Sequence, residues 1–135
     1  MDDWMPTALF QMLQLKPDQR LLLLNPPQGY ATHLASELAG VPLLAESQEK
    51  MEAVLLFINN LAEVSRLAPV AIRLVLPDGL LWIAYPKGSS RIKTDVNRDT
   101  LWKTIEPTGW RPVRQIAIDE VWSAMRFRPS SQVGK

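Results

Sequence analysis

The chain contains no cysteine and only one histidine, His33, among its 135 residues. The absence of cysteine excludes disulfide bonds, thiolate zinc sites and cysteine nucleophiles. A single histidine excludes a histidine-rich metal site, and we expect no bound metal. No apolar run approaches the roughly 18 residues that cross a bilayer, and the acidic start at residues 1–4 is unlike a signal peptide. These absences predict a cytoplasmic protein without membrane association.

Length and composition indicate one folded domain with an uneven charge distribution. Apolar residues make up 47% of the chain and charged residues 21%, close to the average of soluble proteins. We expect one domain over residues 1–128 and a flexible tail over 129–135. Residues 1–84 carry five basic and nine acidic groups, whereas residues 85–135 carry ten and five. The cationic second half permits an anionic ligand or a protein partner, unless the two halves pair within the fold.

Apolar runs indicate buried strands, and helical spacing indicates the segments between them. Strands are expected at residues 21–24, 41–45, 53–58 and 80–85. Helices are expected at residues 6–15, 30–38, 60–76 and 97–109. Pro69 is expected to kink or divide the third helix, and residues 77–79 to form a turn into the next strand.

The last part of the chain has the spacing of an antiparallel hairpin. Two strand-like runs, 113–118 and 121–127, are separated only by Asp119 and Glu120. Strands that alternate with helices and end in a hairpin predict a three-layer, Rossmann-like α/β domain with a mainly parallel sheet. The seven residues between 41–45 and 53–58 are too few for an ordinary crossover, so the sheet is abbreviated. Its short exposed edge permits a homodimer.

This order of elements resembles the class I methyltransferases in shortened form. The resemblance implies S-adenosylmethionine binding through an acidic residue and a glycine-rich turn after the first strand. Here Asn25 stands in place of the acid, and Pro26 and Pro27 offer no N–H groups. Glu46 lies about 20 residues further on, where an acid could hold ribose hydroxyls, or it is a solvated loop residue. We therefore expect the protein to bind no cofactor. S-adenosylmethionine is the candidate cofactor with which this expectation is tested.

A second resemblance rests on residues 81–87, 111–115 and 117–128, with the polar residues between them. These segments are similar to a family of small bacterial proteins of unknown function. The similarity implies the same shortened methyltransferase-like fold and no particular activity.

The loop that follows the strand at 80–85 is a candidate binding site, because ligands of open α/β sheets bind beyond the carboxyl ends of the strands. Cations and hydroxyl groups there suit a phosphate or carboxylate. The alternative is a solvated basic loop in which Asp95 pairs with Arg98. The candidate residues, including two from the first half of the chain, are Tyr85, Lys87, Ser89, Ser90, Lys93, Asp95, Arg98, Asn25 and Glu46.

The hairpin supplies three further candidates, Asp119, Trp122 and Arg126. Adjacent turn carboxylates tend to point to opposite sides, which disfavours a catalytic pair. Asp119 is therefore expected to shape the turn or to pair with Arg114 or Arg126. Arg126 needs a partner if its face of the strand is covered.

Four tryptophans, Trp82, Trp102, Trp110 and Trp122, are interleaved with Arg and Lys, a pattern that suits single-stranded nucleic acid binding. The alternative is that they belong to the core. Trp82 lies in a buried strand and Trp102 on an apolar helix face, which favours the core for these two.

Three functional hypotheses follow. The first is a non-catalytic, methyltransferase-like binding or assembly module with a degenerate cofactor loop. The second is an enzyme or sensor that binds a small anionic or nucleotide ligand at residues 85–98. The third is nucleic-acid binding.

Overall fold

The computed structural model describes residues 8–38, 40–88, 90 and 92–133. Within these residues, six strands form one sheet in the order β2-β1-β3-β4-β6-β5. Strands β2, β1, β3 and β4 are parallel, and β6 is antiparallel to β4 and β5. The predicted sheet with its antiparallel hairpin is confirmed. The strands are β1 Leu21–Leu24, β2 Leu43–Leu44, β3 Met51–Phe57, β4 Val75–Pro86, β5 Trp110–Ala117 and β6 Trp122–Pro129.

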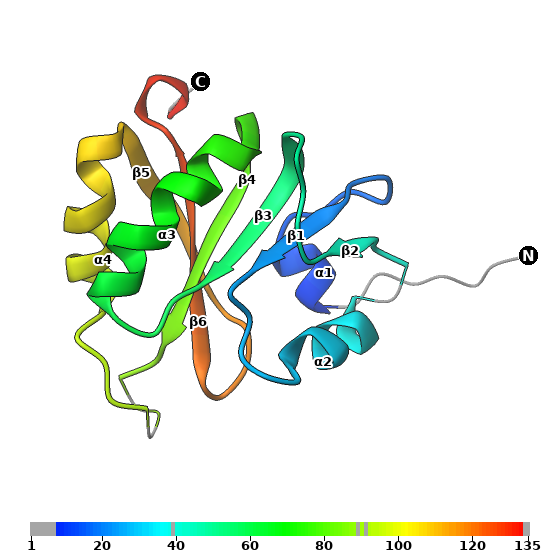
Figure 1. Ribbon diagram of the computed structural model, residues 1–135, viewed down its shortest axis with the longest axis horizontal. Coiled ribbons are helices and arrows are strands. Elements are labelled where there is room, and N and C mark those ends of the chain that lie inside the picture. Colours follow the sequence, from blue (N-terminus) through cyan, green and yellow to red (C-terminus); the bar gives the residue numbers. More distant parts are fainter. Residues whose placement is uncertain (1–7, 39, 89, 91, 134–135) are drawn as a thin grey trace, which may run out of the picture.

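Helices cover both faces of the sheet, which gives the three predicted layers (Figure 1). Helices α1 (Ala8–Met12) and α2 (Tyr30–Glu37) lie on one face, and α3 (Leu61–Leu74) and α4 (Arg98–Ile105) on the other. Two 3-10 helices, η1 (Glu106–Thr108) and η2 (Ser130–Gln132), complete the regular structure of the described residues. None of the helices in the described ranges is both long and apolar enough to span a membrane.

Strand β3 is buried on both faces, as its continuous apolar run predicts. Ala53, Leu55 and Phe57 belong to the cluster under α1 and α2, whereas Val54 and Leu56 belong to the cluster under α3 and α4. All five have 0% exposed surface. The alternation of the strand therefore divides one apolar run between two cores.

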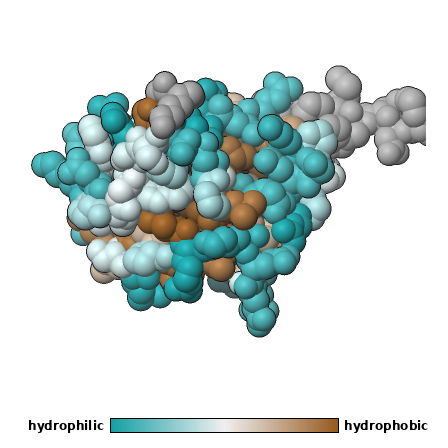
Figure 2. Space-filling view, turned by 90° about the horizontal axis from the view of Figure 1, so that it is seen from above, coloured by the Kyte–Doolittle hydropathy of each residue, from teal (hydrophilic) through white to brown (hydrophobic). Residues whose placement is uncertain are grey.

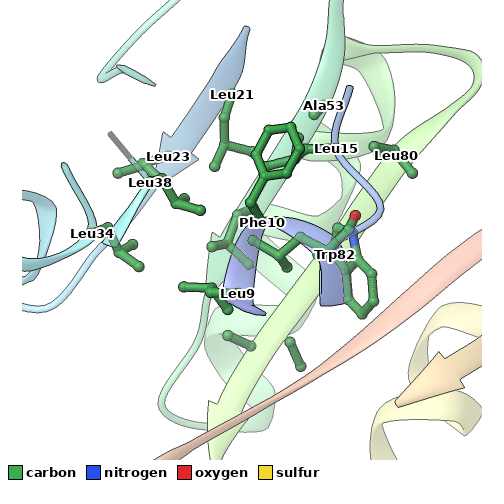
Figure 3. Close-up of a cluster of buried hydrophobic side chains, with 14 of the residues drawn as sticks. Leu9, Phe10, Leu15, Leu21, Leu23, Leu34, Leu38, Ala53, Leu80 and Trp82 are labelled. Carbon is green, nitrogen blue, oxygen red and sulfur yellow. The ribbon is translucent and has the colours of Figure 1, made fainter. Parts of the chain in front are cut away.

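A short helix and a loop seal the first of these cores. Figure 3 shows Leu9 and Phe10 of α1 together with Leu21 of β1 and Trp82 of β4. The indole N–H of the fully buried Trp82 donates to the backbone carbonyl of Leu13 over 3.0 Å. A polar group that would otherwise be buried without a partner thus ties the end of α1 to β4.

The short connection between β2 and β3 is explained by the place of β1, which lies between them. Strand β2 is only two residues long, and Leu44 lies level with Val54 of β3 through the shared partner Leu22. The chain must therefore move back about 10 Å along the sheet and about 10 Å across it to reach Met51. Residues 45–50 can span more than about 20 Å when extended, so no helix is needed there.

The boundary between α3 and β4 differs from the prediction. Helix α3 runs through Pro69 without ending, stops at Leu74, and is followed at once by β4. Residues 77–79 are an irregularity within β4, where the pairing with β3 shifts register between Met51 and Ala53. The turn predicted at residues 77–79 is not formed as a separate element, because pairing of Val75 with Met51 extends the strand across it.

Figure 2 shows the molecule from the side on which α3 ends and β4 begins. Apolar residues form a band across the middle of this face, framed by hydrophilic residues. Leu76, which is 37% exposed, lies in the first part of β4.

Gly79 should tolerate no side chain, because β3 and the start of β4 approach it closely. A Cβ atom there would lie 2.9 Å from Cγ2 of Val75 and 3.0 Å from the carbonyl oxygens of Glu52 and Leu76. We expect Gly79→Ala to lower the free energy of unfolding by about 1–3 kcal/mol in urea denaturation. Gly88→Ala, which meets nothing within 4 Å, is the matched control and should change stability little. Equal effects of the two changes would contradict this account.

Candidate functional site

The strand order reverses between β1 and β3. Helix α2 leads from β1 to β2 on one side, and α3 leads from β3 to β4 on the other. In open α/β sheets, ligands bind in the crevice beyond the carboxyl ends of the strands at this switch point. The switch point here is formed by the loop after Leu24 and by Ile58, Asn59 and Asn60 after β3.

Asn25 joins the two sides of the switch point. Its Nδ2 donates to the carbonyl of Phe57 over 2.9 Å and to Oε1 of Glu63 over 3.3 Å. The same Glu63 oxygen accepts from the backbone N and the Nδ2 of Asn59 over 2.7 and 3.0 Å. Asn25 has a φ of 57°, in the left-handed region that Asn tolerates better than most residues. An amide donor is thus used where the methyltransferase resemblance leads one to expect an acid.

The basic loop is fastened to the start of α3. Oδ1 of Asp95 accepts from the backbone N of Leu61 over 2.8 Å, and the hydroxyl of Thr94 donates to the carbonyl of Asn59 over 2.6 Å. The expected pair of Asp95 with Arg98 is not formed. Nε of Arg98 lies 3.9 Å from Asp99 instead. Asp95 therefore acts as a helix cap in this arrangement.

The other candidates of the loop are dispersed. The hydroxyl of the buried Tyr85 accepts from Nε2 of Gln115 over 2.9 Å, and Ser90 donates to the carbonyl of Lys87 over 2.8 Å. Lys93 is exposed, and Ser89 lies outside the described residues. A hollow of about 390 Å³ lies within the loop, lined by Gly88, Ser90, Ile92, Lys93, Thr94, Val96 and Asn97.

The hairpin turn is connected to α2. Oδ1 of Asp119 accepts from the backbone N–H groups of Val121 and Trp122, each over 2.8 Å, and Oδ2 accepts from the hydroxyl of Tyr30. The predicted role of Asp119 in shaping the turn is confirmed, and its pairing with Arg114 or Arg126 is not formed. Tyr30 was not among the residues predicted from the sequence. Its only signal was its position as the first residue of a helix after a proline-rich loop.

The pKa values of the Tyr30–Asp119 pair shift in opposite directions. Burial and the hydrogen bond to Asp119 raise the pKa of Tyr30 above its usual value, so the hydroxyl remains a donor. Burial of Asp119 opposes ionisation, but hydrogen bonds from Tyr30, Trp122 and Val121 outweigh it and lower the pKa of the carboxyl. The pair is therefore a neutral phenol that donates to a carboxylate.

Aromatic rings extend this contact into the core. The Tyr30 ring lies 5.3 Å from those of His33 and Phe57, and Phe57 lies 5.2 Å edge-on from Trp122. Trp82, Trp110 and Trp122 are buried, as the core alternative predicts. Trp102 is 41% exposed, which corrects its assignment to the core.

The two arginines of β6 have separate partners. Arg128 makes two 2.7 Å hydrogen bonds to the carboxylate of Asp78, and this pairing lowers the pKa of the Asp78 carboxyl. Nη1 of Arg126 donates to Oε1 of Gln14 over 2.7 Å, while its Nε is buried without a partner. Arg126 thus obtains a neutral partner rather than an acidic one.

The end of β2 offers few polar groups. Glu46 is exposed after this strand. A hollow of about 160 Å³ beside it is lined only by apolar residues, Leu23, Pro26, Ala31, Ala35, Leu43, Leu44 and Ala45. Within the described ranges, no group of three or more His, Asp or Glu side chains is placed to hold a metal ion.

A scan against protein-family models and a search of curated proteins find no match for the sequence. Solved structures do match. Fibrillarin in its complex with Nop5p aligns with a TM-score of 0.54 at 14% identity, over 93% of this chain and 83% of that chain. A SAM-dependent methyltransferase from Aquifex aeolicus aligns with a TM-score of 0.53 at 14% identity, over 90% and 89% of the two chains. A Streptococcus agalactiae protein of the NADB-Rossmann superfamily aligns with a TM-score of 0.53 at 13% identity, over 96% and 70%.

The fold is Rossmann-like and similar to that of SAM-dependent methyltransferases. At these identities the likeness concerns the fold alone, and it confirms the Rossmann-like, methyltransferase-like topology that the sequence predicts.

The Asn25 contacts can be tested by changing the amide to the acid. Asn25→Asp should place a carboxylate against the Phe57 carbonyl and the Glu63 carboxylate, and we expect it to lower the free energy of unfolding at pH 7 by about 1–2 kcal/mol. Asn25→Gly is the control, because glycine accepts the positive φ but has no side chain. N25D should be less stable than N25G. Wild-type stability of N25D would contradict the role of the amide as a donor.

The Tyr30–Asp119 contact should make stability depend on acid pH. Because the folded-state pKa of Asp119 is lowered, its contribution is present above the unfolded value of about 3.9 and is lost as pH falls through the folded one. We expect Tyr30→Phe to cost about 1–2 kcal/mol at pH 7 and less at pH 3 in chemical unfolding.

Tyr85→Phe is the control, since its hydroxyl accepts from the neutral Gln115 and its removal should cost the same at both pH values. A Tyr30→Phe cost that is identical at pH 7 and pH 3 would contradict the assigned pairing.

Proposed function

We propose that this domain is a methyltransferase-like binding or assembly module that does not use S-adenosylmethionine. The carrying observation is the Asn25 amide, which joins the ends of β1 and β3 where a cofactor would bind. Its hydrogen bonds to Phe57 and Glu63 would have to break to admit a ligand into the crevice.

Three further features around the switch point do not fit S-adenosylmethionine. Pro26 and Pro27 provide no N–H groups to a ligand carboxylate. The hollow of about 160 Å³ between α2 and β2 is below the roughly 300 Å³ of ordinary ligand pockets, and its lining offers no polar side chain. Glu46, the candidate for holding ribose, is exposed beyond it.

A role in assembly is supported by the fibrillarin likeness. Fibrillarin, which shares this fold at 14% identity, was solved as a complex with Nop5p. A methyltransferase-like domain that has closed its cofactor crevice retains its outer surfaces, and these are what an assembly module uses.

Calorimetric titration with S-adenosylmethionine tests the proposal. We expect no saturable heat at ligand concentrations up to about 1 mM, because binding would require breaking the Asn25 contacts without replacing them. A dissociation constant in the micromolar range would overturn the proposal. The same titration is repeated with the Asn25→Gly variant, because this substitution opens the crevice without adding an acidic side chain.

The basic loop favours a second candidate, binding of a small anion. Its hollow of about 390 Å³ contains Lys93, which makes no hydrogen bond or ion pair with the described residues. Ser90, Thr94 and Asn97 also line it, but each already uses its side chain in a hydrogen bond within the protein. The free ammonium group is the observation that supports an anionic ligand there.

Thermal unfolding with inorganic phosphate and pyrophosphate tests this second candidate. A ligand bound by the folded state raises the melting temperature by mass action. Lys93→Ala should abolish the rise, whereas Lys103→Ala, an exposed lysine on α4, should preserve it. No rise with either anion, or equal loss in both variants, would dispose of the site.

A further inference from the structure

A groove of about 360 Å³ lies between α4 and the edge of the hairpin. Arg98, Asp99 and Trp102 line it from α4, and Gln115 and Met125 line it from β5 and β6. It is separated from the switch point by β4, because β3 and β6 pair with opposite edges of that strand. The closure at Asn25 therefore does not affect it.

Trp102 is placed unusually for its residue type. The side chains of Leu101 and Ile105, on the core face of α4, are completely buried. Trp102 on the same helix is 41% exposed and lines the groove. Its indole N–H makes no hydrogen bond with the described residues. Val113, which is 39% exposed, lines the same groove. Two of the four large exposed hydrophobic side chains among the described residues thus face one hollow.

Arg98 also lacks an evident structural purpose. It is the first residue of α4, where the helix dipole disfavours a cation. Its one ion pair among the described residues is a 3.9 Å contact with Asp99, and both side chains are mostly exposed. Arg98 precedes Trp102 by four residues, so the two side chains lie on the same face of the helix. The groove therefore combines an exposed indole with an exposed guanidinium whose ion pair with Asp99 is long.

The β5 wall of the groove is irregular. Pro112 pairs with Phe127 and Arg114 with Arg126, so Val113 is the extra residue of a β-bulge. The bulge and the missing N–H of Pro112 prevent a further strand from pairing regularly with this part of β5. An extended peptide added to the sheet is thus a poor occupant, and a flat ligand lying against α4 is a better one.

We propose that the groove binds a nucleotide unit, with the base stacked on Trp102 and the phosphate at Arg98. Aromatic side chains stack on any base, and guanidinium groups bind phosphate through paired hydrogen bonds. The Asp99 carboxylate and the Gln115 amide oxygen provide acceptors for the edge of the base. Arg114 adds positive charge at the rim.

The inference deepens the proposed binding role and rests on it, since it names a ligand class for the module. A stacked base with a phosphate is common to free nucleotides and single-stranded nucleic acid. The two sources differ in their salt dependence, because a strand that contacts several phosphates releases several counterions.

The experiment follows fluorescence of the intact protein on titration with AMP, GMP, adenosine, inorganic phosphate and a ten-nucleotide single-stranded RNA. Stacking on the exposed Trp102 should quench its emission. We expect Trp102→Ala and Arg98→Gln each to weaken nucleotide binding about tenfold or more, with binding of the variants measured by calorimetry. Lys103→Gln, which removes one charge from the same helix outside the groove, should stay within about twofold.

Each outcome is decisive. AMP or GMP binding that both groove variants weaken supports the inference, and much tighter, steeply salt-dependent RNA binding with the same sensitivity identifies nucleic acid as the source. The inference is overturned if adenosine or phosphate alone binds as strongly as the nucleotides. It is also overturned if neither variant weakens nucleotide binding, or if no nucleotide binds. S-adenosylmethionine binding that both variants leave intact would instead refute the proposed function, and the two failures are therefore distinguishable.

Discussion

The structure depends on burying β3 on both of its faces. A parallel strand of this kind must be covered by a helical layer on each side, because neither face can be left to water. Helices α1 and α2 supply one layer, and α3 and α4 the other. The parallel strands then end on one side of the sheet, so the loops after β1, β3 and β4 are brought together there.

At that edge the chain uses its polar groups for internal contacts. Asn25 and Glu63 connect the ends of β1 and β3, Asp95 caps α3, and Asp119 holds Tyr30. Each contact satisfies a backbone or side-chain group that a ligand could otherwise have satisfied. These internal contacts at the carboxyl ends of the strands are the basis of the proposed binding or assembly role.

The abbreviated connection between β2 and β3 has a related consequence. A two-residue β2 leaves the chain close to the start of β3, so six residues suffice to pass β1. No helix accompanies this passage, and the hollow between α2 and β2 is small and apolar. The exposed Trp102 and Arg98 lie instead at the far side of the sheet, in the groove between α4 and β5.

Much of the fold was predictable from single segments of sequence. The four leucines of β1 and the apolar residues 53–57 of β3 indicate buried strands because no polar side chain interrupts either run. Two residues between the last strands indicate a hairpin, and the proline pair after β1 indicates a loop without donors. These inferences succeed because each depends on neighbours in the chain.

What only the tertiary structure decided depends on partners far apart in sequence. Asp119 was expected beside Arg114 or Arg126, yet Tyr30, 89 residues away, donates to it because α2 lies over the hairpin turn. Trp102 has the helical spacing of a core residue, but α4 lies near the sheet edge and leaves the indole in a groove. The sequence by itself determined most of the elements and placed Asn25, Pro26 and Pro27 after the first strand, because these features depend on local patterns. The packing of the layers decided which charges are paired and which aromatic ring is free, because these depend on distances that no local pattern encodes.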